Sequence, residues 1–105
     1  MTNYVFAYRG GADMATQTPE QQEQSMADWT AWFGALGSAV VQIGNPFGRS
    51  STVQPDGSTT DGGASALKGF TVVTATDLPA AANLAKDCPL LREGGTVEVY
   101  EAIEM

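Results

Sequence analysis

The chain lacks histidine altogether and has a single cysteine, Cys88, among its 105 residues. Ser-His-Asp and Cys-His catalytic arrangements are therefore impossible. Without clustered cysteines, the carboxylates offer at most a weak site for a hard cation, so we expect no metal. A lone cysteine cannot form an internal disulfide, which is typical of the reducing cytoplasm. Apolar residues flank Cys88 in the sequence, and we expect it to be buried rather than nucleophilic.

Basic residues are also scarce, with five Lys and Arg against 12 Asp and Glu and a net charge of −7. This charge repels phosphate backbones and anionic lipid, so we expect no nucleic-acid or membrane partner. The N-terminus has no basic segment followed by a long apolar run, which predicts neither a signal peptide nor a membrane span. Gly10-Gly11 matches neither a phosphate-binding loop nor a dinucleotide fingerprint, and we expect no cofactor.

The length predicts one domain over residues 1–105, with enough hydrophobic residues (43%) to build a core. A domain of this size has a modest stability margin, which is compatible with an oligomer. Hydrophobic patterning and turn residues predict core strands over residues 3–9, 38–43, 67–75 and 96–103. The first strand is apolar at both odd and even positions, so we expect both of its faces to be covered.

The first helix is marked by its capping residues. Thr18 is placed as N-cap, with Pro19 at the first helical position and Gln21 in the third, as in a capping box. The helix is predicted to run to about Leu36, where Gly37 follows. One apolar stripe is predicted to face the core, made by Met26, Trp29, Phe33 and Leu36. Trp32 lies off the centre of this stripe, at the core edge or partly exposed in a pocket or contact.

Residues 44–66 form a long, Gly-rich connection, and such segments are commonly functional or mobile. Within it, Pro55-Asp56-Gly57 is a tight-turn sequence between two short β-prone segments, so we expect a small hairpin. Asp77 is a good N-cap for a second helix over residues 78–87.

The resulting order, β-α-β-hairpin-β-α-β, is typical of a ferredoxin-like α+β fold. Such a fold has a four-stranded antiparallel sheet with two helices on one face. The other face then needs a cover. A second copy of the chain, pairing through the sheet to make a dimeric α/β-barrel type of assembly, would supply it. The alternative is that the 44–66 connection folds back over its own sheet.

Spaced landmarks in the chain resemble the YCII-related family, in the branch named for an Asp-Gly-Pro-Phe (DGPF) motif. They are the Asp56-Gly57 turn, Asp61-Gly62 followed by the strand from Leu67, and, at the C-terminal end, Asp77-Leu78, Cys88-Pro89 and Val97-Glu98-Val99. The name motif is degenerate, because Gly63-Ala64 stand where Pro-Phe would follow. The resemblance implies a dimeric α/β-barrel-type fold and a cleft with polar residues that looks like an active site.

Asp61 is the best candidate for general acid/base work, because it lies in a Gly-rich loop at the matched motif. The alternative is that Asp61 braces its own turn, which is ordinary for Asp before Gly. Glu98 lies in the last strand, and Arg9 at the end of the first strand is its expected partner. They could form a structural ion pair or bind a ligand.

The aromatic residues Tyr8, Trp32 and Tyr100 could line a small apolar cleft, although aromatic residues at such spacings are more often core or interface. Two classes of function stay open. One is a cytoplasmic homodimer that binds a small molecule or a partner in a cleft, without strong catalysis. The other is a cofactor-independent enzyme on a small polar or aromatic substrate, with Asp61 as acid/base and Arg9 or Tyr100 orienting the substrate.

Overall fold

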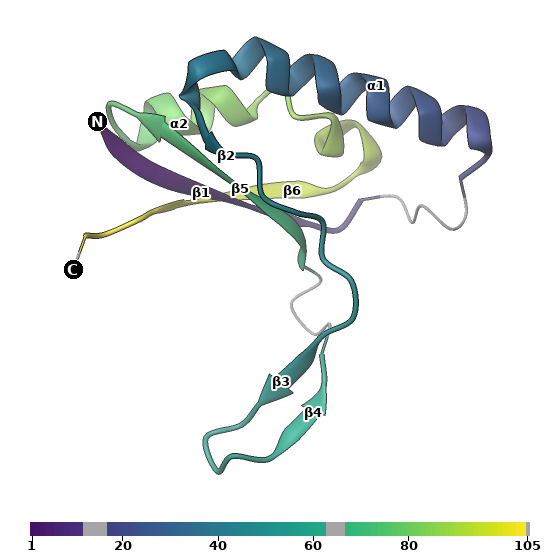
Figure 1. The fold of residues 1–105 in the computed structure, drawn as a ribbon, viewed down its shortest axis with the longest axis vertical. Helices are drawn as coiled ribbons and strands as arrows, with labels where there is room; N and C mark the ends of the chain where they lie inside the picture. The colour runs from purple at the N-terminus through teal and green to yellow at the C-terminus, as the bar shows by residue number, and fades with distance from the viewer. Residues whose placement is uncertain (12–16, 63–66, 105) are drawn as a thin grey trace.

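The structure is a computed structural model that describes residues 1–11, 17–62 and 67–104 (Figure 1). It is α+β, as predicted, with a four-stranded antiparallel sheet in the order β2-β5-β1-β6 and a separate two-stranded sheet. The main sheet comprises β1 (Thr2–Arg9), β2 (Val40–Gln42), β5 (Leu67–Ala75) and β6 (Thr96–Glu101). The other elements are helices α1 (Pro19–Leu36) and α2 (Leu78–Ala85), the 3-10 turns η2 (Gly37–Ala39) and η3 (Pro89–Glu93), and the hairpin strands β3 (Ser51–Val53) and β4 (Thr59–Asp61).

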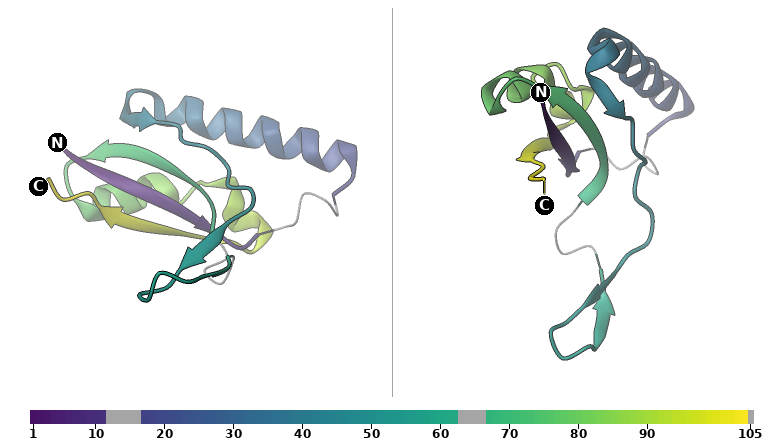
Figure 2. Two further views of the ribbon diagram at one scale, coloured as in Figure 1. Left: turned by 60° about the horizontal axis from the view of Figure 1, so that its bottom comes forward. Right: turned by 60° about the vertical axis from the view of Figure 1, so that its left-hand side comes forward.

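Both α-helices lie on the same side of the main sheet (Figures 1 and 2). Strand β1 alternates accordingly: Tyr4, Phe6 and Tyr8 are buried under the helices, whereas Val5 and Ala7 on the opposite side are only half-buried. The Phe6 ring stacks on Trp32 of α1 with centroids 6.1 Å apart. The face of the sheet that carries Val5 and Ala7 has no helix over it in the described part of the chain. The first strand is therefore not covered equally on both sides within one chain.

The predicted caps are present at both helices. The Thr18 hydroxyl accepts a hydrogen bond from the Gln21 backbone N–H at 3.2 Å, and the Gln21 side chain accepts one from the Thr18 N–H at 2.9 Å. Asp77 accepts a hydrogen bond from the Ala80 N–H at 2.9 Å. These bonds satisfy backbone donors that the first helical turn leaves unpaired. Helix α2 ends at Ala85, two residues before the predicted end at 87.

The apolar stripe of α1 differs from the prediction. Met26 is 67% exposed, whereas Trp32, placed off the stripe's centre, is buried at 5% exposure. The reason for this difference is how α1 packs on the sheet. The N-terminal half of α1 reaches past the ends of the strands in Figure 1, so it has less sheet to pack against than the C-terminal half. The residues that contact the core are Trp29, Trp32, Phe33 and Leu36, at the helical spacing i, i+3, i+4 and i+7.

The strand boundaries were predicted too generously at two places. The second core strand begins at Val40 rather than residue 38, because residues 37–39 form the 3-10 turn η2. The last strand ends at Glu101, and Ile103 beyond it is 79% exposed. The edge position of β2 and β6 explains this, since each has only one neighbouring strand to extend its ladder.

The hairpin within residues 44–66 is confirmed. Strands β3 and β4 pair antiparallel, and Gly57 at a φ of 88° donates its N–H to the Gln54 carbonyl in the turn. The hairpin projects away from the main sheet instead of folding back over it (Figures 1 and 2). All six strand residues are exposed. Strands β3 and β4 therefore provide no cover for the sheet face that carries Val5 and Ala7.

Candidate functional site

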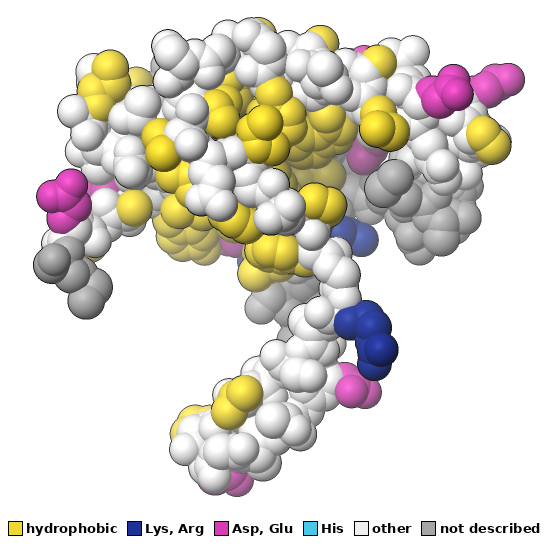
Figure 3. Space-filling view, in the orientation of Figure 1, with side chains coloured by type: hydrophobic (Ala, Val, Ile, Leu, Met, Phe, Trp, Pro, Cys, Tyr) yellow, Lys and Arg dark blue, Asp and Glu magenta, His cyan; other side chains and the backbone are white. Residues whose placement is uncertain are grey.

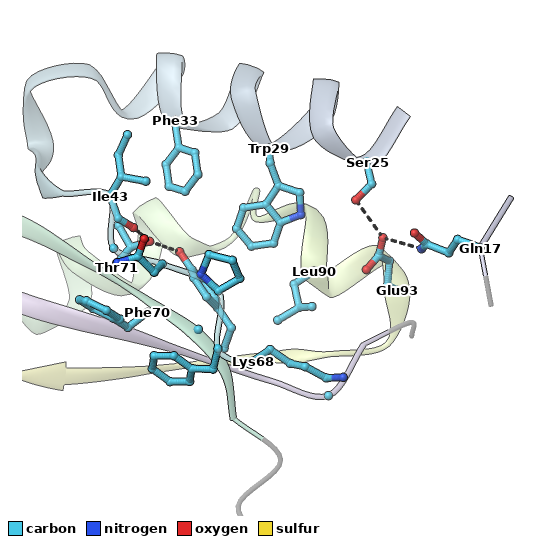
Figure 4. Close-up of a pocket in the computed structure, with 17 residues that line it drawn as sticks. Gln17, Ser25, Trp29, Phe33, Ile43, Lys68, Phe70, Thr71, Leu90 and Glu93 are labelled. Carbon is cyan, nitrogen blue, oxygen red and sulfur yellow. Dashed lines mark hydrogen bonds between the residues drawn. The ribbon is translucent and has the colours of Figure 1, made fainter. Parts of the chain in front are cut away.

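A cleft of about 460 Å³ lies beneath α1, on the helical side of the sheet. Its walls come from α1, the segment 43–47 that follows β2, the first half of β5 and the turn η3. Figure 3 shows apolar side chains gathered in a hollow below α1, and Figure 4 shows the side chains that line the cleft. This volume falls in the range of sites that bind small organic molecules.

Aromatic residues dominate the cleft lining. Tyr8, Trp29 and Phe33 form one wall, in which the Trp29 ring is edge-on to Tyr8 at 5.1 Å and 5.8 Å from the ring of Phe33. Phe47 and Phe70 also contribute to the lining, but Phe70 lies opposite Ala7 in the register, so its ring is on the sheet face away from the helices, where it stacks on Phe47 with centroids 5.9 Å apart. Rings that pack against one another in this way hold their positions, so the apolar part of the cleft is largely pre-formed.

A buried chain of hydrogen bonds closes the floor of the cleft. The Tyr8 hydroxyl donates to the Thr71 hydroxyl at 2.6 Å, and Thr71 donates to the Ile43 carbonyl at 2.8 Å. Burial raises the pKa of Tyr8 well above its usual value, and the hydrogen bond with Thr71 offsets this only in part. Tyr8 therefore keeps its proton as the donor that starts the chain, and the chain ties β1 and β5 to the segment after β2.

Gly44 allows that segment to approach β5 closely. Its φ is 79°, and a Cβ at this position would overlap the Phe70 carbonyl oxygen. The segment then pairs with β5 through the Phe47 N–H, which donates to the Lys68 carbonyl at 2.7 Å. Only glycine combines this backbone conformation with such a close contact.

The far end of the cleft is polar (Figure 4). Glu93 of η3 accepts hydrogen bonds at Oε1 from Ser25 of α1 at 3.4 Å and from the Gln17 amide nitrogen at 3.5 Å. The other amide atom, Gln17 Oε1, is buried and has no partner among the residues that the structure describes. Lys68 of β5 also lines the cleft. The cleft thus combines apolar rings with a few polar groups gathered at one end.

Of the three aromatic residues predicted to line a cleft, only Tyr8 does so. Trp32 is buried in the core, where its indole N–H donates to the Leu84 carbonyl at 3.1 Å. Tyr100 is 54% exposed in β6, opposite Val5 of β1, on the sheet face away from the helices. The strand register separates these residues, because Tyr8 and Tyr100 point to opposite sides of the sheet.

The predicted ion pair between Arg9 and Glu98 is present, with nitrogen and oxygen 3.4 Å apart. Strands β1 and β6 are neighbours, and Glu98 lies opposite Ala7. The pair is on the same sheet face as Tyr100, and both side chains are partly exposed (40% and 36%). It therefore lies outside the cleft, and a pair this exposed contributes little to stability.

Asp61 lies at the end of β4, exposed on the projecting hairpin and opposite Ser51. It is not among the residues that line the cleft. The neighbouring Gly63-Ala64 of the degenerate motif lie outside the described residues. The role of Asp61 as acid/base stays a prediction, and the structure does not bring it together with Arg9, Tyr8 or Trp32.

Sequence reasoning missed most of the cleft. Trp29 and Phe33 were assigned to the core stripe, which is their role in part, but each also presents a ring to the cleft. Glu93 and Gln17 gave no local signal, because they become neighbours only when η3 packs near the start of α1. The length of the connection 44–66 did indicate a functional segment, since its first residues form a wall of the cleft.

No protein-family model matches the chain, and no curated protein matches it. Neither helix in the described part of the chain is long and apolar enough to span a membrane. Within the same ranges, no group of three or more Cys, Asp or Glu side chains is placed to hold a metal ion.

Proposed function

We propose that this protein binds a small, ring-bearing organic molecule in the cleft below α1, without strong catalysis. The observation that carries this proposal is the cleft itself: about 460 Å³, lined by packed aromatic residues, with polar groups confined to one end. Ligand sites in proteins typically combine apolar walls with a small number of placed polar groups. The buried Tyr8–Thr71–Ile43 chain supports the proposal, because it stiffens the floor before any ligand arrives.

The binding test uses indole as a neutral ring probe and two variants of adjacent residues on α1. Ser25 lines the cleft, whereas Met26 points to solvent. Ser25→Phe should fill the cleft and weaken indole binding by about tenfold or more, whereas Met26→Phe should leave it unchanged within about twofold. Binding can be followed by NMR shifts of cleft amides and by calorimetry. Absence of indole-induced shifts at cleft residues in the unmodified protein would refute the proposal.

We further propose that the protein is a homodimer paired through its open face, defined as the sheet surface of Val5, Ala7, Val72 and Tyr100 with the Arg9–Glu98 pair. Val5 lies directly between Val72 and Tyr100 in the register, so these apolar side chains are contiguous. Soluble monomers rarely expose such a sheet surface. The adjacent opposite charges of Arg9 and Glu98 suit a twofold interface, in which each copy offers the same patch.

The strand order β2-β5-β1-β6, with both helices on one side, supports a ferredoxin-like architecture and, with the proposed dimer, an α/β-barrel type of assembly. Membership of the YCII-related family, in its Asp-Gly-Pro-Phe branch, stays a proposal supported by the landmarks given above. A cytoplasmic location is likewise proposed, and the single reduced cysteine supports it.

The enzymatic alternative has less support. Its acid/base residue, Asp61, is exposed on the hairpin and borders no aromatic cleft. Arg9 and Tyr100, which were expected to orient a substrate, lie on the other face of the sheet from the cleft. We therefore favour binding over catalysis.

A further inference from the structure

The polar end of the cleft holds a surplus of hydrogen-bond acceptors. Glu93 receives its two hydrogen bonds on Oε1 alone, from neutral donors and at the long distances of 3.4 and 3.5 Å. Its second oxygen, Oε2, accepts no hydrogen bond from the described residues. The Gln17 amide nitrogen points toward Glu93, so the amide oxygen, Gln17 Oε1, is a buried acceptor without a partner. A buried acceptor without a donor costs free energy, so a missing donor would be favoured here.

The charge at this end is also uncompensated. The described residues form two ion pairs, Arg9–Glu98 and Arg92–Asp28, and neither involves Glu93. Arg92 is the neighbour of Glu93 in the chain, yet it pairs with Asp28 at 3.7 Å. Lys68 lines the cleft without forming an ion pair to Glu93 within 4 Å. A donor that also carries positive charge would therefore satisfy both the hydrogen-bonding and the electrostatic deficit.

Aromatic rings stand next to these acceptors. Figure 4 shows Trp29 on α1 between Phe33 and the Ser25–Glu93 hydrogen bond, with Leu90 below it. A cation beside an indole ring gains from the negative face of the ring, and Trp provides the strongest such interaction. An apolar ring on the same ligand would fill the space between Tyr8, Trp29 and Phe33.

We propose that the cleft selects protonated aryl-alkyl amines, with the ammonium group held by Glu93 and Gln17 and the ring held by the aromatic wall. This inference rests on the proposed function of the same cleft. A ligand with a carboxylate is the rival class, since Lys68 could pair with it. We favour the amine because Gln17 Oε1, which is buried without a partner, and Glu93 Oε2, which receives neither of the two hydrogen bonds to that carboxylate, are both acceptors.

The test compares three probes that share a phenyl ring and differ at the other end: 2-phenylethylamine, 2-phenylethanol and 3-phenylpropanoate. Each is titrated into the full chain by NMR and calorimetry. The amine should bind about tenfold more tightly than the alcohol, the factor expected from one charge-assisted hydrogen bond. Its preference should shrink as salt is raised, a readout that needs no variant.

Two variants with the same change in net charge sharpen the test. Glu93→Gln removes the charge in the cleft, whereas Glu23→Gln removes one from the exposed surface of α1. Glu93→Gln should bring the amine and the alcohol to within about twofold of each other, and Glu23→Gln should keep the tenfold preference.

The outcomes separate the two proposals. If the amine and the alcohol shift the same cleft amides with equal affinity, the inference of amine selection fails and the proposed binding function stands. Tightest binding of the carboxylate overturns the inference in favour of Lys68. If none of the probes perturbs cleft residues, both proposals fail.

Discussion

Tyr8 connects the core of the protein to the wall of the cleft. Its ring packs edge-on against Trp29 and Trp32, with centroid distances of 5.1 and 6.4 Å, and its hydroxyl starts the hydrogen-bond chain to Thr71. The side chain is 6% exposed. A buried hydroxyl needs a partner, and Thr71 supplies it from the neighbouring strand. One residue thus serves packing and the proposed binding site at once.

Cys88 is buried at 1% exposure, as predicted, and burial raises the pKa of its thiol to about 11. An unfolded chain loses this proton near pH 8.5, so between about pH 8.5 and 11 only the unfolded state is deprotonated. The free energy of unfolding should therefore be unaffected by this group below pH 8.5 and fall above it, by at most about 1.4 kcal/mol per pH unit.

Urea unfolding at pH 7.5, 8.5 and 9.5 measures this loss. Cys88→Ala provides the control, because it removes the titrating group while keeping a small apolar side chain. The variant is expected to be less stable at neutral pH, owing to the lost sulfur, but to show a shallower decline above pH 8.5. An equal alkaline decline in both proteins would assign it to other groups. The buried Tyr8, whose pKa is also raised, can contribute only at higher pH, since an unfolded tyrosine titrates near pH 10.

Among the elements, the segment after β2 determines the shape of the cleft. It follows β5 closely enough to form a backbone bridge between Pro46 and Gly69. It then leaves the sheet for the β3–β4 hairpin, whose three-residue strands are exposed throughout. A two-stranded hairpin without a core is marginally stable in water. The structural role of this connection therefore lies in its first residues, at the edge of the sheet.

Gly44→Ala tests that role. Alanine would have to adopt a φ of 79° and would overlap the Phe70 carbonyl oxygen, so we expect a loss of about 2 kcal/mol or more in the free energy of unfolding. Gly48→Ala, four residues later, places its Cβ in open space and should change stability by less than about 0.5 kcal/mol. Urea unfolding of both variants measures the difference. Similar stabilities for the two would mean that the close approach at Gly44 relaxes at little cost.

At the scale of the whole molecule, helices cover one face of the main sheet, and no helix among the described residues covers the open face. The two faces differ in how far their side chains are buried. Phe6 and Val73 are completely buried on the helical side, whereas Val5 and Val72 are half-buried on the open face. The net charge of −7 keeps copies apart at long range, and it must be overcome by apolar contact at the proposed interface. The dimer should therefore strengthen as salt is raised.

Light scattering coupled to size exclusion tests the dimer. The chain mass is 11.0 kDa, and we expect about twice this mass at micromolar concentration. Val72→Glu should yield the monomer, because it places a charge in the middle of the open face. Met26→Glu introduces the same negative charge on the exposed surface of α1 and should leave the dimer intact. A mass near 11 kDa for the unmodified chain in dilute solution would contradict the proposal.

Much of the secondary structure followed from local sequence. The capping residues Thr18 and Asp77 and the turn at Pro55–Gly57 act through neighbours within four positions, so their effect is visible in the chain itself. The ion pair of Arg9 with Glu98 was also predictable, once the first and last strands were expected to be adjacent. Strand β5 begins and ends where predicted, because its apolar run is bounded by clear turn residues.

The sequence by itself thus determined the α-helices and β-strands, their order and the α+β class, because caps, turns and hydrophobic periodicity are local properties. Only the tertiary structure decided which side of α1 meets the sheet, and so exchanged Met26 for Trp32 in the core. It alone brought Gln17, Ser25 and Glu93 together from three separate segments. Such a site depends on how elements pack across long sequence distances, and packing leaves no short-range signal in the chain.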